Sequence, residues 1–525
     1  MSGFQNTEEI LTEAYRSDLR RMTSQITDDR LLKSTGIEEM IYKDLYNENE
    51  ELQAYEKQGE QKMKTFKSLI QDIFQSVYGI NLKYRSEVEL SPIARRLNKP
   101  ILSDVMADEN YAVIKSCCEG KELPAMGATE ELTEALLGKL DQLLQMITGG
   151  NGKIDALDLL EQSQKKMAKQ LLEYLEQRQE RSTQPEKMDK EALRLANRIA
   201  GKAEQKKLYE KLIETRVAQY RAERQKIVQA AMRKAAEKAQ EIESILLAWG
   251  NDSGEMKKTP FHTDLLKRVS ASEKLRYIAK FLGRFKKMLA EKRMNGYTYG
   301  RGQKYDITYG SDISKALTSE LALLARTETI PLFLKKYRNS QIKQYRKREP
   351  EYKGKGDIVV CLDESQSTYG ENNAYGMAIA MLMYEICKVN HTNFALIHFS
   401  KATKVDFFPK DKTVPYENIL NCAETFLSGG TNFVKPLKEF IKLSEEGKFN
   451  KADIVFITDG ICNVPEEFLR EFQDYKRRTG AKLTGILLDK GQNIPFTLEK
   501  LADHIYRTSE LLREEIVGKL LDKRI

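Results

Sequence analysis

The chain has 525 residues, of which 41% are hydrophobic and 31% are charged, and its net charge at pH 7 is +8. This length suggests three or four domains of about 150 residues each. The composition excludes both a wholly disordered chain and an integral membrane protein. No window reaches the roughly 18 to 20 uninterrupted apolar residues that a membrane span needs. The first residues lack the basic and apolar regions of a signal peptide, so we expect a cytoplasmic protein.

Residues 1–255 are predicted to form an α-helical region with long helices. Apolar residues recur three and four positions apart up to about Gly150, as in LDQLLQMI, which is typical of helices with one buried face. Between Ala156 and Trp249 the sequence is rich in Ala, Leu, Glu, Lys and Gln and contains only one proline. We therefore expect long helices with coiled-coil-like packing in this part.

Residues 256–356 form a basic segment that we expect to be helical or linker-like. It holds about 25 basic and 9 acidic side chains, so its net charge is about +16 and exceeds that of the whole chain. The stretch from Gly296 to Asp312 is predicted to be an irregular loop, and Lys315 to Tyr345 is predicted to be helical. The charge indicates either solvated helix faces or a surface for an acidic protein, anionic lipid or nucleic acid.

Residues 357–525 are predicted to form an α/β domain. The short apolar runs GDIVVCLDES, NFALIHFS, KADIVFITDG and AKLTGILLD alternate with helical stretches. That alternation is typical of a doubly wound, mostly parallel sheet that helices cover on both faces. We expect the cysteines Cys361 and Cys387 and the methionines Met377, Met381 and Met383 to be buried in its core.

A cluster of oxygen-bearing side chains follows the predicted strands. Ligands of such sheets bind beyond the carboxyl ends of the strands. The first strand ends in Asp363, Ser365 and Ser367, the fourth in Asp459, and a glycine-rich turn between them carries Thr431. Three hydroxyls and two carboxylates suit a small hard cation, which prefers about six oxygen ligands. The set is equally compatible with Mg²⁺ and Mn²⁺.

These five positions resemble the metal-ion-dependent adhesion site (MIDAS) of the von Willebrand factor A (VWA) family, whose signature is DxSxS, then Thr, then Asp. The resemblance implies a Rossmann-like domain whose cation is bridged by an acidic residue of a partner protein, so that the site binds rather than catalyses. The family usually has small residues between the ligands, whereas this chain has Glu364 and Gln366. We expect Glu364 to face solvent.

The segment around the junction with this domain resembles ViaA-type proteins, through Glu320 to Leu324 and through Gly354 to Asp357. Those proteins are partners of MoxR-family AAA+ ATPases such as RavA. The resemblance implies a chaperone adaptor that docks onto such an ATPase, stimulates it or directs it to protein clients, and contacts the inner face of the membrane peripherally.

An enzyme is not expected, because the chain has neither a Walker GxxxxGK[ST] motif nor a GxSxG elbow. No catalytic residue and no organic cofactor are predicted. His398 lies within an apolar strand and is interpreted as a core or strand-end histidine, and Asp489 as a residue that caps a turn rather than a metal ligand.

RNA binding is the alternative function, because a helical region joined to a VWA domain also resembles the layout of Ro-type proteins. Tyrosines that could stack on bases are interleaved with the basic residues. They are Tyr297, Tyr299, Tyr305, Tyr309, Tyr337 and Tyr345.

Overall fold

The computed structural model describes residues 10–24, 27–149, 152–180, 185–250, 256–299, 304–311, 313, 316–326, 328–347, 356–412, 414–449, 451–460, 462–489 and 498–524. The chain divides into two compact units. Unit 1 comprises residues 1–246 and 250–267, and unit 2 comprises residues 247–249 and 268–525.

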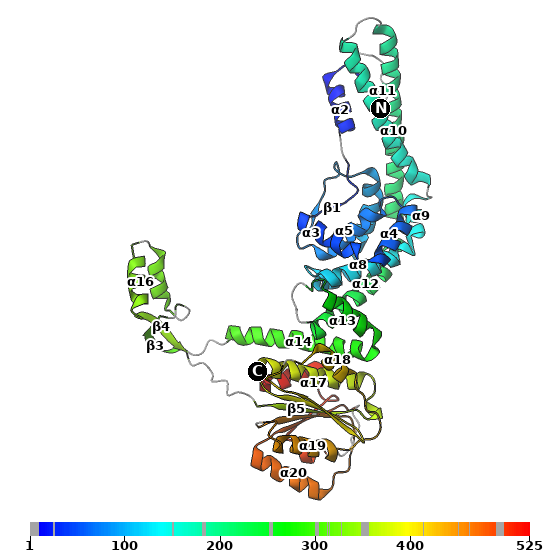
Figure 1. Ribbon diagram of the computed structural model, residues 1–525. Coiled ribbons are helices and arrows are strands. Elements are labelled where there is room, and N and C mark those ends of the chain that lie inside the picture. The colour runs from blue at the N-terminus through cyan, green and yellow to red at the C-terminus, as the bar shows by residue number, and fades with distance from the viewer. Residues whose placement is uncertain are drawn as a thin grey trace. The chain divides into compact units, whose positions relative to one another are not determined.

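Unit 1 is built almost entirely from helices, as the sequence predicts (Figure 1). A two-residue antiparallel pair, β1 (Leu32–Lys33) and β2 (Lys83–Tyr84), is its small strand element. Its helices are α2 (Glu13–Ser24), α3 (Gly36–Asn47), α4 (Glu50–Lys62), α5 (Phe66–Tyr78), the π-helical η1 (Ala94–Asn98), α6 (Lys99–Met106), α7 (Tyr111–Cys118), α8 (Glu122–Leu137), α9 (Leu140–Thr148), α10 (Gly152–Glu180), α11 (Pro185–Gln219), α12 (Arg221–Trp249) and α13 (Pro260–Ala271), the last two ending in unit 2.

Local sequence explains where these helices start and what they bury. Thr35 and Glu38 form a reciprocal capping box at the start of α3, which satisfies backbone amides that a helix otherwise leaves unpaired. Helix α5 contributes Leu69 and Ile73 to the large core of unit 1. The long helices α10 and α11 pack side by side, and α2 packs against them through Leu19. The predicted long helices are thus confirmed.

Unit 2 contains a six-stranded sheet with the order β10-β9-β8-β5-β6-β7. All neighbouring strands are parallel except β7, which is antiparallel to β6, so the predicted mostly parallel sheet is confirmed. The order reverses between β5 and β8, which makes their junction the topological switch point of the sheet. The strands are β5 (Ile358–Asp363), β6 (Phe394–Phe399), β7 (Thr403–Phe408), β8 (Asp453–Thr458), β9 (Leu483–Leu487) and β10 (His504–Arg507).

Helices cover both faces of this sheet (Figure 1). They are α17 (Glu371–Asn390), α18 (Tyr416–Glu424), α19 (Val434–Glu445), α20 (Glu466–Thr479), α21 (Leu498–Leu501) and α22 (Arg513–Arg524). Val359 and Cys361 of β5 share a buried cluster with Phe440 of α19 and Phe472 of α20. Leu362, the residue after Cys361, faces α17 on the other side of the sheet, and every residue of β5 is buried. This is why the strand has no polar residue before Asp363.

Helix α14 (Glu273–Tyr299) belongs to the same compact unit as the sheet and packs on α17. The rings of Phe281 and Phe285 contact the ring of Tyr375 edge-on, with centroids 5.7 and 5.9 Å apart. The sequence places α14 in the preceding basic segment, whereas its contacts group it with the α/β domain.

The basic segment contains a β-hairpin module, residues 304–347, that the sequence does not predict. Strand β3 (Lys304–Gly310) lies within the expected irregular loop and pairs antiparallel with β4 (Ile342–Lys347), which lies at the end of the expected helix. The alternation of Tyr305, Ile307 and Tyr309 suits a strand, and cross-strand pairing supplies its hydrogen bonds. Between the strands lie α15 (Thr318–Leu321), the 3₁₀ turn η3 (Ala322–Ala325) and α16 (Ile330–Arg338).

Some of the residues that the sequence analysis singled out cannot be placed. Gly354 and the side chains of Tyr297, Tyr299, Tyr305 and Tyr345 lie outside the described residues. No helix in the described part of the chain is both long and apolar enough to cross a membrane.

The close packing of α17 on the sheet gives a test of this fold. A Cβ on Gly376 would lie 2.6 Å from Leu362 Cδ1 and 3.2 Å from Ile457 Cγ2. Gly376→Ala should therefore destabilise unit 2 by about 1 to 3 kcal/mol through overpacking. Hydrogen exchange of the β5 amides, measured at increasing urea concentrations, should show that the variant loses protection at a lower urea concentration than wild type does. Gly447→Asn, at a position with φ +72° and open space around it, is the control and should leave the midpoint nearly unchanged.

Candidate metal centre

The candidate site lies where β5 and β8 end. These strands are adjacent and parallel, with Leu362 opposite Ile457, so their carboxyl ends lie at one edge of the sheet. Asp363 is the last residue of β5, and Asp459 directly follows β8. The two predicted carboxylates therefore flank the switch point, where ligands of doubly wound sheets bind.

Hydrogen bonds join four of the five predicted residues. Asp363 Oδ1 accepts from the Ser365 amide at 2.9 Å. The hydroxyl oxygens of Ser365 and Ser367 lie 3.1 Å apart, and the Ser367 hydroxyl donates to Asp459 Oδ1 at 3.0 Å. The structure thus brings two hydroxyls and two carboxylates together, as expected from their alternation along a tight loop.

Thr431 approaches the same place from the glycine-rich turn. A Cβ built on Gly460 would lie 3.2 Å from Thr431 Oγ1 and 3.6 Å from Asp363 Oδ2. Both oxygens are therefore close to one point beside Gly460, and a side chain there would press on Thr431. In the same turn, Ser428 and Gly429 have positive φ angles of 57° and 110°. Glycine adopts that backbone conformation without strain.

Sequence reasoning missed two threonines that hold the site. Thr458 donates to Asp363 Oδ2 at 2.5 Å and accepts from the Gly460 amide at 3.0 Å. Thr368 donates to the carbonyl oxygens of Asp363 and Ser365 at 3.1 and 2.8 Å. Thr458 could have been noticed, because it is a polar residue at the end of an apolar strand, beside Asp459.

The carboxyl of Asp363 is buried, with a side chain 1% exposed. Burial raises its pKa above the ordinary value, hydrogen bonds from Thr458 and Ser365 oppose the rise, and the charge of Asp459 adds to it. A cation between the two carboxylates would remove their mutual repulsion.

The prediction that Glu364 faces solvent is wrong. Its side chain is fully buried, and Oε1 lies 2.8 Å from His398 Nδ1. Oε2 accepts from the Leu427 amide at 2.9 Å. An acidic residue in a surface loop usually points outward, but here a histidine and a backbone amide compensate the carboxylate inside the domain.

His398 is a core histidine of β6, as predicted, and it contacts two groups besides Glu364. Its Nε2 lies 3.1 Å from Asp406 Oδ2 and 3.5 Å from Cys422 Sγ. Burial opposes charging of the ring, but hydrogen bonds with Asp406, Cys422 and Glu364 outweigh it and raise the pKa of His398 to about 10. Among the described residues, His398, Asp406 and Cys422 also form a group with ligand atoms within 4.8 Å of one another.

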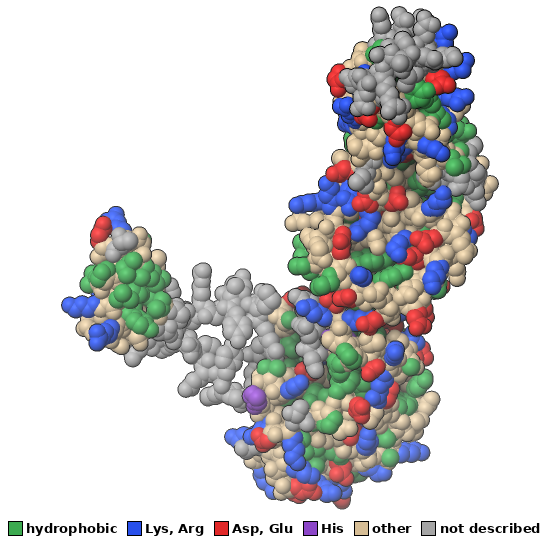
Figure 2. All heavy atoms as spheres, turned by 45° about the horizontal axis from the view of Figure 1, so that its top comes forward, with side chains coloured by type: hydrophobic (Ala, Val, Ile, Leu, Met, Phe, Trp, Pro, Cys, Tyr) green, Lys and Arg blue, Asp and Glu red, His purple; other side chains and the backbone are tan. Residues whose placement is uncertain are grey.

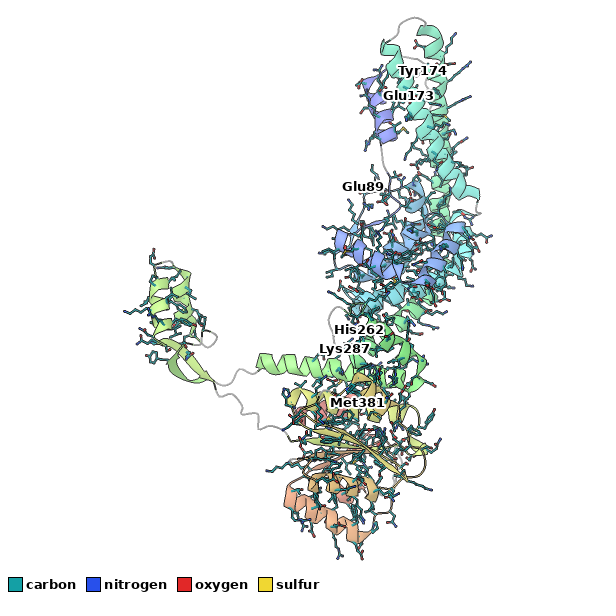
Figure 3. The ribbon with its side chains drawn as sticks, viewed as in Figure 1. Glu89, Glu173, Tyr174, His262, Lys287 and Met381 are labelled. Carbon is teal, nitrogen blue, oxygen red and sulfur yellow. The ribbon has the colours of Figure 1, made fainter. Side chains whose placement is uncertain are left out.

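The residues interpreted as non-functional occupy the expected places. Cys361, Cys387, Met377, Met381 and Met383 are buried, the last four on α17, where Figure 3 labels Met381. Asp489 accepts from the Ser509 amide at 3.0 Å, so it caps the turn after β10, whereas the sequence suggests that it caps the turn that follows its own strand.

Comparison with known proteins identifies the domain. Residues 358–461 match the von Willebrand factor type A domain family. This stretch contains all five predicted metal-site residues, so this part of the chain is a VWA domain with a MIDAS-like arrangement. The resemblance to ViaA-type proteins stays a prediction.

Two uncharacterized proteins of Methanocaldococcus jannaschii are similar to this chain. One is 28% identical over 252 residues, which cover 48% of this chain and 57% of that protein. The other is 31% identical over 261 residues, which cover 49% of this chain and 65% of that protein. The matches thus span less than two thirds of either relative.

Among solved structures, proximal thread matrix protein 1 of the mussel byssus is 22% identical, over 33% of this chain and 47% of that one, with a TM-score of 0.26. A second structure of that protein, with zinc in its MIDAS motif, has the same identity and coverage and a TM-score of 0.25. Superpositions with such scores add no support to the fold or to the site.

The raised pKa of His398 predicts pH-dependent stability. In the unfolded chain a histidine titrates near pH 6.5, whereas in the folded domain this imidazolium keeps its proton to about pH 10. The stabilisation is therefore complete below about pH 6.5 and is lost as the pH rises toward 10. Calorimetry in EDTA should show the melting temperature of unit 2 decreasing between about pH 6.5 and 9. In His398→Gln this decrease should be smaller, and equal slopes for both proteins would contradict the assignment.

Proposed function

We propose that the VWA domain binds Mg²⁺ or Mn²⁺ through Asp363, Ser365, Ser367, Thr431 and Asp459, and uses the cation to dock onto a partner protein. The observation that supports this is the chain of hydrogen bonds Ser365–Ser367–Asp459 at the carboxyl edge of the sheet. It gathers hydroxyls and a carboxylate beside a second, buried carboxylate at the switch point.

The donor chemistry fits a hard divalent cation. All candidate ligand atoms are oxygens, which Mg²⁺ prefers, and five of them leave a coordination position open. Two carboxylates neutralise the two charges of the cation. An acidic side chain of a partner can therefore enter the open position without meeting a surplus of negative charge.

The partner that we propose is a MoxR-family AAA+ ATPase. The chain has no nucleotide-binding motif of the Walker type, and its resemblance to ViaA-type proteins supports an adaptor role. In this proposal the helical unit 1 recognises a protein client, and the ATPase supplies the energy that remodels it.

The β-hairpin module offers a second contact surface, because apolar and basic side chains gather on it (Figure 2). Leu332 is 48% exposed, Leu334 is 55% exposed and Tyr337 is 43% exposed, and Lys335 and Arg338 lie on the same helix, α16. Such a surface suits an anionic partner. Anionic lipid and RNA both have the charge it requires, and exposed Tyr309 and Tyr337 keep RNA binding as the alternative function.

Asp363→Ala tests the metal site. Loss of even an outer-shell partner of a metal ligand costs about 10- to 100-fold in affinity, so loss of this carboxylate should weaken Mn²⁺ binding by more than about 100-fold. Titration of the full chain with Mn²⁺, followed by electron paramagnetic resonance, measures this. The matched control is Asp489→Ala, which removes a carboxylate that follows the neighbouring strand β9 and should leave the affinity unchanged.

The partner is tested with the same two variants in a pull-down from native lysate, read by mass spectrometry and nucleic-acid staining. An AAA+ ATPase should be recovered with wild type and Asp489→Ala in Mg²⁺, and be lost in EDTA and with Asp363→Ala. RNA recovered equally with all variants, and lost at high salt, would favour the alternative function, because phosphate contacts are strongly salt-dependent.

A further inference from the structure

Glu364 stands between two of the proposed ligands, but its contacts are with other parts of the domain. Its backbone amide donates to Phe399 O at 2.8 Å, and its carboxylate contacts the Leu427 amide and His398. A residue that connects the DxSxS loop with two other segments can fix where this loop lies.

The segment that Glu364 holds leads directly into the turn that carries Thr431. Leu427 precedes that turn, and its amide donates to the buried carboxylate at 2.9 Å. Two further hydrogen bonds join the same loops: the Gln366 amide donates to Gly429 O at 2.9 Å, and Ser428 Oγ donates to Gln366 Oε1 at 2.7 Å. Of these three contacts, that of Glu364 is made by a fully buried side chain.

The carboxylate of Glu364 is also held from the sheet, by His398. His398 on β6 lies between Glu364 and Asp406 of β7, whose Oδ2 also contacts Lys404 Nζ at 3.1 Å. Removal of one partner from such a buried, charged set leaves another charge uncompensated. The carboxylate of Glu364 is thereby held in one position.

Thr431 is the proposed ligand that depends most on this connection. Among the hydrogen bonds found for the described residues, none joins Thr431 to the other four ligands. Its position relative to Asp363 therefore depends on its own loop, which Glu364 holds through Leu427 and Gln366 holds through Ser428 and Gly429.

We propose that Glu364 and His398 are positioning residues of the metal site: together they hold the turn that carries Thr431 against the loop that carries Asp363, Ser365 and Ser367. This inference rests on the proposed metal-binding function.

A double-mutant cycle on the full chain tests the inference, with Mn²⁺ affinity as the readout. Glu364→Ala should weaken Mn²⁺ binding by about 10- to 100-fold, the usual effect of removing a group that orients metal ligands. Because the effect acts through Thr431, Glu364→Ala should weaken binding much less when it is introduced into Thr431→Ala. A general loss of stability would not produce this non-additivity.

Two further variants serve as controls. Glu364→Gln keeps the shape and an acceptor for the Leu427 amide, so it should fold, bind Mn²⁺ better than Glu364→Ala and carry the test if the alanine variant does not fold. Asp357→Ala removes another buried carboxylate, whose Oδ1 accepts from the Asn393 amide at 2.8 Å at the opposite end of β5. It should leave Mn²⁺ affinity unchanged.

The outcomes separate the inference from the function on which it rests. Wild-type affinity in both Glu364 variants, or fully additive effects with Thr431→Ala, would overturn the inference while Asp363→Ala still abolishes binding. Wild-type affinity in Asp363→Ala would overturn the metal site itself. If Cys422→Ser instead abolished binding, the cation would lie at His398, Asp406 and Cys422, and both proposals would fail.

Discussion

Two consecutive buried carboxylates stand at the end of β5, Asp363 as its last residue and Glu364 directly after it, and the arrangement of the site depends on how each is compensated. Glu364 contacts the imidazolium of His398 and a backbone amide. The donors that reach Asp363 are the hydroxyl of Thr458 and the amide of Ser365. Burial of a carboxylate with neutral donors alone is unfavourable, and the nearby charge of Asp459 makes it more so. The negative charge of Asp363 is therefore less well compensated than that of Glu364. This difference favours a cation beside Asp363.

The sequence predicted the sheet and the cluster of ligands because both depend on local patterns. A buried parallel strand is mostly apolar, so the polar residues that follow an apolar run mark the edge where ligands bind. That reasoning found Asp363 and Asp459 without knowledge of the strand order. The contact between Glu364 and His398 could not be predicted in this way, since it depends on the register that places Leu362 opposite His398 in β6. A single sequence shows that residue 364 is acidic, but not toward which side of the loop it points.

The hairpin of β3 and β4 was missed for a related reason. Its strands pair Ile307 with Tyr345 across an intervening helical segment, so the interaction that stabilises each strand is far away in the sequence. Locally, glycines and tyrosines around Gly296 resemble a loop, and the lysines and glutamines before Tyr345 resemble a helix. Long helices such as α10 and α11 were predictable because their sequence is rich in Ala, Leu, Glu, Lys and Gln, which favour a helix without any distant partner.

In the proposed metal site, the hydrogen bonds would assist cation binding rather than compete with it. A serine hydroxyl has one hydrogen and two lone pairs. When Ser367 donates its hydrogen to Asp459, it accepts the hydrogen of Ser365 with one lone pair, and its second lone pair can face a cation. Both bonds restrict rotation of the hydroxyl. Thr458, the last residue of β8, orients the carboxylate of Asp363 in the same way. Since these groups are ordered before a cation binds, little entropy is lost on binding. The position of the glycine-rich turn that carries Thr431 is then the part of the proposed site that these hydrogen bonds do not fix. In our inference the contacts of Glu364 hold that turn in place.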